Sequence, residues 1–209
     1  MASRLDEVAW PRRTRRLLLR PAVLADADTT WPIRNDEEVL RWMTSAPQTL
    51  WDYRAMFLLP DRLEKTLVVE RDGVVIGDLM LAVEDAWSQR EVADQARGVQ
   101  AELGWCIGSR HQGNGYATEA VEELLRICFE DLSLRRVTAN CFADNEASWR
   151  LMERLGMRRE AYTLRESLHR SGQWLDGMGY ALLAEEWQSR DVPAAAVPMR
   201  SGEVEGREL

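Results

Sequence analysis

The chain has 209 residues, of which 45% are hydrophobic and 30% charged, a composition typical of one globular domain with a sizeable core. The net charge of −8 argues against sequence-independent binding to nucleic acid. No apolar run is long enough to predict a membrane span, and the first residues lack the apolar core typical of a signal peptide. Three cysteines without metal-ligand spacing, Cys106, Cys128 and Cys141, favour reduced thiols, a cytoplasmic location and no metal site.

The first half of the chain is expected to begin with an irregular arm over residues 1–13, followed by strands and helical pieces. The arginines that crowd the first twenty residues are typical of the solvated flank of an edge strand. Asp72-Gly73 between two apolar runs predicts a hairpin. The polar segment 84–98 is long for a connection and is expected to be a functional flap or simply mobile. Strands are expected at 17–19, 67–70 and 74–81, and helices at 25–31, 35–43 and 51–59.

The second half alternates strands and helices more regularly. A helix that begins at Asp144 or Asn145 and ends at Gly156 has a typical polar N-cap and glycine C-cap. Residues 190–209, rich in proline, glycine and charge, are expected to be a disordered tail. Strands are expected at 100–107, 137–142, 162–168 and 174–183, and helices at 116–132 and 145–155. This order predicts one mixed α/β sheet.

The most informative stretch is Gln112-Gly113-Asn114-Gly115-Tyr116-Ala117-Thr118, which joins a predicted strand to a predicted helix. A glycine-containing loop at a helix N-terminus presents free N–H groups and partial positive charge, which suits a phosphate. The dinucleotide-binding fingerprint fails because Thr118 stands where its third glycine belongs. The P-loop pattern fails because Lys65, the only lysine of the chain, lies far from this loop.

The remaining pattern, Gln112-x-x-Gly115-x-Ala117, resembles the pyrophosphate loop of the GNAT acetyltransferase superfamily. Asn145-x-x-Ser148 followed by Leu155-Gly156-Met157 resembles the fourth helix of that family. Residues 14–21 and 35–39 resemble the RimJ/RimL-like branch, named for ribosomal-protein alanine N-acetyltransferases. The resemblance covers about residues 14–187 and implies a single GNAT domain over 14–189, with a mostly antiparallel sheet of about seven strands flanked by helices.

The resemblance also implies acetyl-CoA as cosubstrate and direct acetyl transfer to a primary amine, on a protein N-terminus or a small molecule. It assigns the pyrophosphate to Gln112, Gly113, Asn114, Gly115, Tyr116, Ala117 and Thr118. It assigns the pantetheine arm to the backbone of Trp105, Cys106 and Ile107, and further cofactor contacts to Asn145 and Ser148. The last two residues are equally a helix cap and its partner.

The proton steps are less well defined by the resemblance. Many GNAT enzymes carry a proton-donating tyrosine seven residues after the helix-opening asparagine, and here that position is Met152. Ser148 is the candidate acid that the RimJ/RimL-like branch implies, and Glu166 is the candidate base. Glu102 is a second candidate base, and surface carboxylates are the alternative for both glutamates. Cys106 is expected to be a small apolar strand residue rather than a covalent acetyl carrier.

The acceptor is left open by the sequence. Trp31, Trp42 and Trp51 fall in the segment that covers the acceptor in this family, where they form an aromatic wall for a cation or pack helices onto the sheet. A second reading of the whole chain is a GNAT-fold module that binds or senses acyl-CoA without turnover, which Met152 favours. The partner is expected to be an amine, not nucleic acid or a membrane, and a homodimer stays open.

Overall fold

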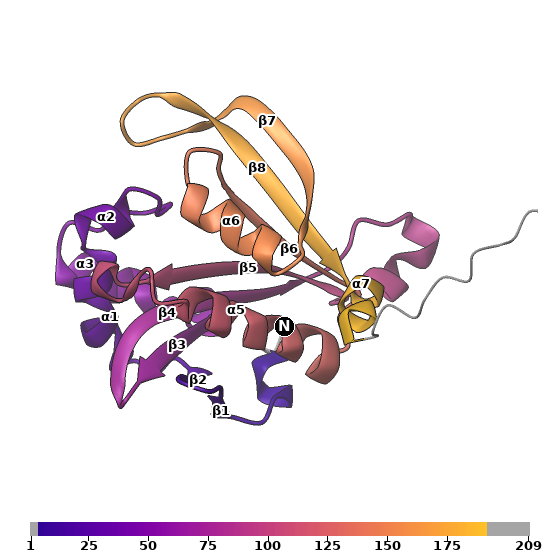
Figure 1. The fold of residues 1–209 in the computed structure, drawn as a ribbon, viewed down its shortest axis with the longest axis horizontal. Helices are drawn as coiled ribbons and strands as arrows, with labels where there is room; N and C mark the ends of the chain where they lie inside the picture. The colour runs from indigo at the N-terminus through magenta and orange to yellow at the C-terminus, as the bar shows by residue number, and fades with distance from the viewer. Residues whose placement is uncertain (1–3, 192–209) are drawn as a thin grey trace, which may run out of the picture.

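The computed structural model describes residues 4–191, and it is built around one sheet of eight strands (Figure 1). The strand order is β1-β2-β3-β4-β5-β6-β8-β7. Neighbouring strands are antiparallel except β5 and β6, which are parallel. The predicted mixed, mostly antiparallel sheet is therefore confirmed. The strands are β1 Arg12–Arg13, β2 Leu18–Pro21, β3 Thr66–Arg71, β4 Val74–Glu84, β5 Gln100–Ile107, β6 Arg136–Phe142, β7 Arg158–Leu168 and β8 Trp174–Leu183.

The sheet has one strand more than expected because part of the N-terminal arm forms regular secondary structure. Residues Arg4–Glu7 form a 3-10 helix, η1, and β1 pairs with β2 through Arg12 and Leu19. The prediction of an irregular arm over 1–13 is thus wrong for these segments. Arg4 donates to the carbonyls of Gly98 and Leu132, so long-range contacts that local sequence does not reveal hold the arm in place.

The helices cover both faces of the sheet (Figure 1). The segment from α1 to α4 covers one face, and α5 and α6 cover the other. The predicted helix 51–59 is confirmed as α3, which ends at Phe57, and Pro60 then begins the separate helix α4. The helices are α1 Asp26–Arg34, α2 Glu37–Leu40, α3 Leu50–Phe57, α4 Pro60–Leu63, α5 Tyr116–Arg126, α6 Glu146–Arg154 and α7 Ala184–Gln188.

Several shorter turns complete the fold. The predicted flap over 84–98 contains a 3-10 helix, η2 Arg90–Ala96, and another 3-10 turn, η3 Ser109–His111, precedes the glycine loop. A π-helical turn, η4 Ile127–Asp131, extends α5, and η5 Ser189–Asp191 follows α7. The rest of the predicted tail, 192–209, lies outside the described residues. Within residues 4–191 no helix is long and apolar enough to cross a lipid bilayer.

Side-chain alternation along the strands builds two cores of unequal size. Leu79 and Leu81 of β4, with Leu103 of β5, belong to the large core under α5 and α6. Val68 of β3 instead packs with Tyr53 and Phe57 of α3 in a small core on the opposite face. Because successive strand residues face opposite sides, Asp78, Met80 and Ala82 face the side covered by α1 to α4.

The central irregularity of the sheet is the divergence of β5 and β6. All eight residues of β5 pair with β4, from Gln100–Glu84 to Ile107–Gly77. On its other side β5 pairs with β6 only from Gln100 to Glu102. From Leu103 onward the backbone of β5 has no strand on that side, so a gap crosses the sheet at this point.

Candidate active site

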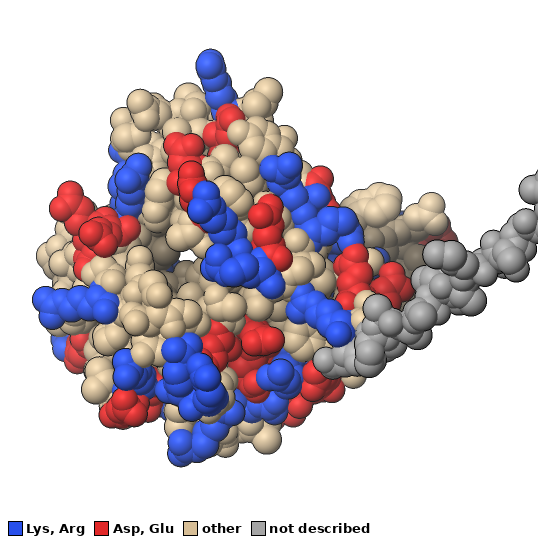
Figure 2. Space-filling view, in the orientation of Figure 1, with Lys and Arg blue, Asp and Glu red and all other residues tan. Residues whose placement is uncertain are grey.

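A cavity of about 1150 Å³ lies at the gap between β5 and β6. Leu103 and Trp105 line it from β5, and Asn145 and Ser148 line it from the start of α6. On the face covered by α1 to α4 it is lined by the segments 42–44 and 59–66, and by β7 and β8. Figure 2 shows a hollow between the part of the molecule that carries β7 and β8 and the part below it. The cavity therefore connects the two faces of the sheet.

Five of the residues that the sequence proposed for catalysis or cofactor binding line this one cavity. They come from β5, the start of α6 and β7: Glu102, Trp105, Asn145, Ser148 and Glu166. Cys106, Ile107 and the loop 112–118 do not line it, although the loop follows directly from the end of β5. The structure thus separates a loop suited to an anion from a cavity that contains the candidate acid and bases.

The glycine loop has the geometry expected of an anion cradle. Gly113 and Gly115 have φ values of 74° and 76°, a left-handed conformation that glycine adopts without steric cost. The first hydrogen bond into α5 runs from the N–H of Glu119 to the carbonyl of Gly115. The N–H groups of residues 116–118 therefore precede the helical ladder and are available to an anion.

Side chains fix the shape of this loop. Gln112 donates through Nε2 to the carbonyl of Ile107 at 2.9 Å, which ties the loop to the end of β5. Asn114 donates to the carbonyls of His111 and Gln112. Arg16 donates to the carbonyl of Asn114 at 2.9 Å, so the loop is held from within and from the N-terminal segment.

Arg16 is a residue that sequence reasoning missed. It binds Glu119 of α5 at 2.6 Å, and its guanidinium lies 4.6 Å from the centre of the Tyr116 ring. Arg71, from the end of β3, lies 5.1 Å from the same ring. Two cations therefore flank the start of α5. The expectation that the N-terminal arginines are merely solvated is wrong for Arg16, and no local pattern around it signals a partner about 100 residues away.

The start of α6 serves both as a helix cap and as a wall of the cavity. The Asn145 side chain accepts the N–H of Ser148 at 3.3 Å, which confirms the predicted N-cap. Ser148 is buried, and its hydroxyl lies beside the thiol of Cys141. Burial raises the pKa of that thiol to about 11, an effect that the Ser148 hydroxyl partly offsets. The Ser148 hydroxyl thus lies at the cavity wall, beside Cys141.

Met152, at the position where the resemblance to GNAT enzymes implies a tyrosine, lies fully inside the large core. It packs there as an apolar residue and does not line the cavity. No tyrosine of the chain takes the place of the missing proton donor. All four of them lie within the described residues, and none lines the cavity: Tyr53, Tyr116, Tyr162 and Tyr180.

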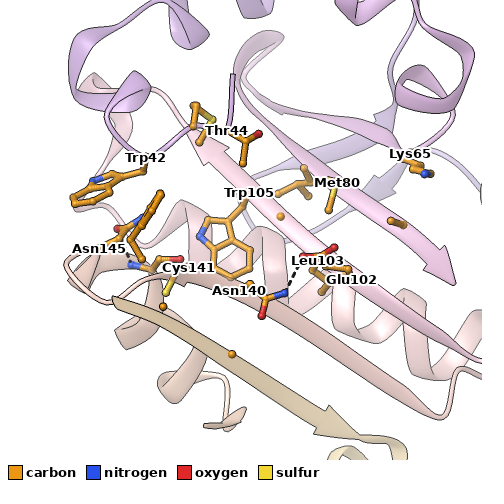
Figure 3. A pocket seen from close by; sticks show the side chains of 18 of the residues that line it. Trp42, Thr44, Lys65, Met80, Glu102, Leu103, Trp105, Asn140, Cys141 and Asn145 are labelled. Atoms are coloured by element: carbon orange, nitrogen blue, oxygen red, sulfur yellow. Dashed lines mark hydrogen bonds between the residues drawn. The ribbon is translucent and has the colours of Figure 1, made fainter. Parts of the chain in front are cut away.

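The two candidate bases approach the cavity on the face covered by α1 to α4. Glu102 accepts a hydrogen bond from Nδ2 of Asn140 at 3.0 Å, across the point where β5 and β6 separate (Figure 3). Figure 3 also shows the Trp105 side chain extending from β5 toward Asn140 and Cys141 of β6. Glu102 therefore has an oriented carboxylate within the gap.

Glu166 lies on an irregular stretch of β7. The register with β8 shifts between Thr163 and Ser167, and Arg165 has φ of 50°. Asp176 of β8 accepts the Arg165 N–H and the Tyr162 hydroxyl, both at 2.8 Å. These hydrogen bonds lower the pKa of Asp176 and hold the bulge, which re-aims a side chain away from regular alternation. The bulge is thus what carries Glu166 to the cavity.

A thiol mechanism receives no support from the surroundings of Cys106. Burial and the nearby Asp78 carboxylate raise the pKa of Cys106 to about 12. Asp78 is itself bound by Arg34, whose Nε lies 2.8 Å from Oδ2. The Cys106 thiol is therefore protonated near neutral pH, which disfavours its use as a nucleophile.

Trp31, Trp42 and Trp51 do not form one aromatic wall, the first of the two alternatives that the sequence left open. Trp31 packs against Tyr53 in the small core, with ring centres 5.3 Å apart, and Trp51 is 76% exposed. Only Trp42 lines the cavity (Figure 3), where its ring lies 6.1 Å from those of Phe142 and His169. For Trp31 the packing alternative is correct.

The β7–β8 turn contacts the segment after α2 on the outer side of the cavity. We call this contact the roof of the cavity. His169 donates through Nε2 to the carbonyl of Arg41 at 2.8 Å, since a carbonyl only accepts. Arg170 donates to the carbonyl of Met43. These bonds and the tilted contact between the His169 and Trp42 rings close the outer side of the cavity.

A split mixed sheet, an anion loop at the end of β5 and a cavity through the split together define an acetyltransferase of the GNAT type. Residues 16–158 match the model of the acetyltransferase (GNAT) domain, so the chain belongs to this family. GNAT acetyltransferases use acetyl-CoA.

Individual relatives agree with this family and with its RimJ-like branch. The uncharacterized N-acetyltransferase YnaD of Bacillus subtilis is 30% identical, over 83% of this chain and 97% of that protein. The [ribosomal protein uS5]-alanine N-acetyltransferase of Escherichia coli is 34% identical, over 41% of this chain and 43% of its own. A GNAT acetyltransferase structure from Bacillus anthracis has a TM-score of 0.69 and 28% identity, covering 83% of this chain and 98% of that one.

Proposed function

We propose that this protein transfers an acetyl group from acetyl-CoA directly to a primary amine, on a small molecule or a protein N-terminus. The observation that carries the proposal is the cavity through the gap between β5 and β6. A potential proton donor, Ser148, lies on the α6 side, and two potential bases, Glu102 and Glu166, lie on the other side. The donor and acceptor therefore enter from opposite faces of the sheet.

The chain's own residues divide the work of binding. The N–H groups of residues 113–118, with Gln112 shaping the loop, bind the pyrophosphate of acetyl-CoA. The backbone of Trp105, Cys106 and Ile107 pairs with the pantetheine arm on the side where β5 has no neighbouring strand. Asn145 and Ser148 contact the arm from α6. Together these contacts hold the thioester in the gap.

The chemistry needs an unprotonated amine, a polarised carbonyl and a protonated leaving group. Glu166 or Glu102 removes a proton from the ammonium form of the acceptor, directly or through water. The amine nitrogen then forms a bond to the acetyl carbon as the carbon–sulfur bond breaks, and the second proton that the nitrogen loses passes through water to restore the Ser148 hydroxyl. A β5 N–H stabilises the developing oxyanion, and Ser148 donates a proton to the departing thiolate. Because Cys106 stays protonated, no acetyl-cysteine forms.

The names of two relatives support an amine as the acceptor. The Escherichia coli relative is named for acetylating alanine of ribosomal protein uS5. Another relative from that organism, 28% identical over 54% of this chain, is named an L-amino acid N-acetyltransferase. Both names describe transfer to an amine, and we propose an amine as the partner of this chain as well.

A second function, acyl-CoA binding without turnover, is favoured by one observation. Met152 lies in the core, so the family's usual tyrosine acid has no counterpart at the cavity. One assay distinguishes the two functions: the protein is incubated with acetyl-CoA and a panel of primary amines, and free thiol is followed. We expect amine-dependent thiol release. Tight acetyl-CoA binding with no release above buffer for any amine would establish the binding module instead.

A further inference from the structure

Some of the charged side chains that line the cavity have an ion-pair partner, and others have none within residues 4–191. Arg34 is bound to Asp78, and Lys65 lies 2.9 Å from Asp61. The other four have no ion-pair partner within residues 4–191. Three are carboxylates and one is a guanidinium: Glu84, Glu102, Glu166 and Arg62. An acceptor that enters this cavity therefore meets several carboxylates and a single unpaired cation.

Arg62 lies in α4, and its backbone is attached to the strands that lead to β5, the strand proposed to pair with the cofactor. Its carbonyl accepts the Thr66 hydroxyl at 2.7 Å, which ties α4 to the start of β3. Thr66 pairs with Met80 of β4, and Met80 pairs with Gly104 of β5. Thr66 and Met80 both line the cavity. Arg62 is thus anchored two strands away from the gap, on the acceptor side.

The guanidinium of Arg62 is half-buried and lacks a hydrogen bond or ion pair in the described part of the chain. In that part, every fully buried polar side-chain atom has a partner, so the Arg62 nitrogens reach solvent. Burial and the neighbouring charge of Arg34 lower the pKa of Arg62. A half-buried cation without a counter-ion is costly, and an anionic ligand would offset that cost.

We propose that Arg62 binds a carboxylate of the acceptor, and that the preferred acceptor is a small amino acid whose amino group faces Glu102 and Glu166. This inference rests on the proposed function and names its substrate class. The planar fork of arginine matches a carboxylate through two parallel hydrogen bonds. A doubly charged phosphate fits less well, because three unpaired carboxylates share the cavity. A protein N-terminus has no free carboxylate beside its amine.

The test compares each amino acid with its own carboxamide, which keeps the amine and removes the negative charge. Thiol release from acetyl-CoA is measured with the full chain for glycine and glycinamide, β-alanine and β-alaninamide, and leucine and leucinamide. We expect wild-type kcat/KM to be about 10- to 100-fold higher for the acid than for the amide. In Arg62→Gln the ratio of kcat/KM for the acid to that for the amide should fall toward one. In Arg62→Lys, which keeps the positive charge, the ratio should lie between the wild-type value and one.

Arg54→Gln is the matched control, because Arg54 lies on α3, is exposed and is bound to Asp28. It should keep the wild-type ratio of acid to amide. Equal rates for acid and amide in the wild type would overturn the role of Arg62 while leaving the acetyltransferase intact. So would an unchanged ratio in a folded Arg62→Gln protein.

Loss of the proposed function itself would look different, since no amine would then release thiol. In that case, calorimetric titration of β-alanine and β-alaninamide into the acetyl-CoA-loaded protein tests Arg62 separately. Binding of the acid alone, lost in Arg62→Gln, would support the carboxylate site. Absence of acid binding would overturn it.

Discussion

Glu166 reaches the cavity only because the backbone of β7 departs from regular pairing. Asp176 holds the bulge through the Arg165 N–H and the Tyr162 hydroxyl. Gly177 leaves room for it, since a Cβ there would lie 2.7 Å from the Thr163 hydroxyl oxygen. Several residues therefore position one carboxylate, an arrangement typical of a functional group.

Replacing Glu166 with glutamine keeps the size of the side chain and removes the carboxylate that we propose as a base. We expect kcat to fall about 100-fold or more, while the Kd for acetyl-CoA changes little. Steady-state kinetics and calorimetry on the same protein give the two values. Glu91→Gln, at an exposed position of η2, is the control. Full activity of Glu166→Gln would remove Glu166 from the mechanism.

The residues that sequence reasoning found are those with local requirements. Gly113 and Gly115 are predictable because a left-handed turn before a helix needs glycine, and Asn145 because a helix needs a cap. Arg16 and Arg62 were not found as site residues. The contacts of Arg16 cross about 100 residues of chain, and what distinguishes Arg62 is its lack of a partner, which no sequence pattern reveals.

At the scale of elements, the split between β5 and β6 defines the site. The sequence predicts both strands, and the family resemblance implies that the backbone of residues 105–107 contacts the cofactor. It does not show that pairing stops after Glu102. Strand register depends on cross-strand packing rather than on either strand alone. The same limit explains why the pairing of β1 with β2 was missed.

The roof of the cavity is a contact between two elements, the β7–β8 turn and the segment after α2. We expect His169→Ala to loosen it, because the change removes the hydrogen bond to Arg41 and the contacts with Trp42 and Phe142. The KM for the amine should rise about fivefold, the worth of one hydrogen bond, with little change in the Kd for acetyl-CoA.

Hydrogen exchange of residues 41–49 provides a direct measure of the roof, and it should quicken in His169→Ala. Trp174→Ala serves as control, since Trp174 is an exposed residue on the same hairpin. Equal exchange rates in wild type and His169→Ala would show that the turn does not hold the roof.

At the scale of the whole molecule, a network of ion pairs connects the edge strand β7 to β6 and α7. Glu160 of β7 binds Arg136 of β6 and Arg158 of its own strand, and Arg158 also binds Glu186 of α7. The hydrogen bond from Arg136, followed by that from Arg158, lowers the pKa of Glu160 from 4.5 to about 2. This network joins three elements outside the cavity.

A carboxylate with a lowered folded-state pKa stabilises the protein above its unfolded pKa, and the contribution is lost as pH falls toward the folded value. Glu160→Gln should therefore lower the free energy of unfolding near neutral pH. The difference from wild type should shrink below about pH 4.5 and vanish near pH 2. Urea denaturation across this range gives the comparison. Asp94→Asn, which breaks an exposed pair, should show little difference at any pH, and a pH-independent effect of Glu160→Gln would exclude the ion-pair explanation.

The central claim is that the loop before α5 binds the pyrophosphate of acetyl-CoA, and calorimetric titration of acetyl-CoA into a Gly115→Val protein tests it most directly. Gly73, in the β3–β4 turn, has a similar φ of 78°, so Gly73→Val carries the same backbone strain away from the loop. We predict that Gly115→Val stays folded and loses acetyl-CoA affinity sharply, while Gly73→Val keeps it. Unchanged affinity in a folded Gly115→Val protein would contradict the assignment.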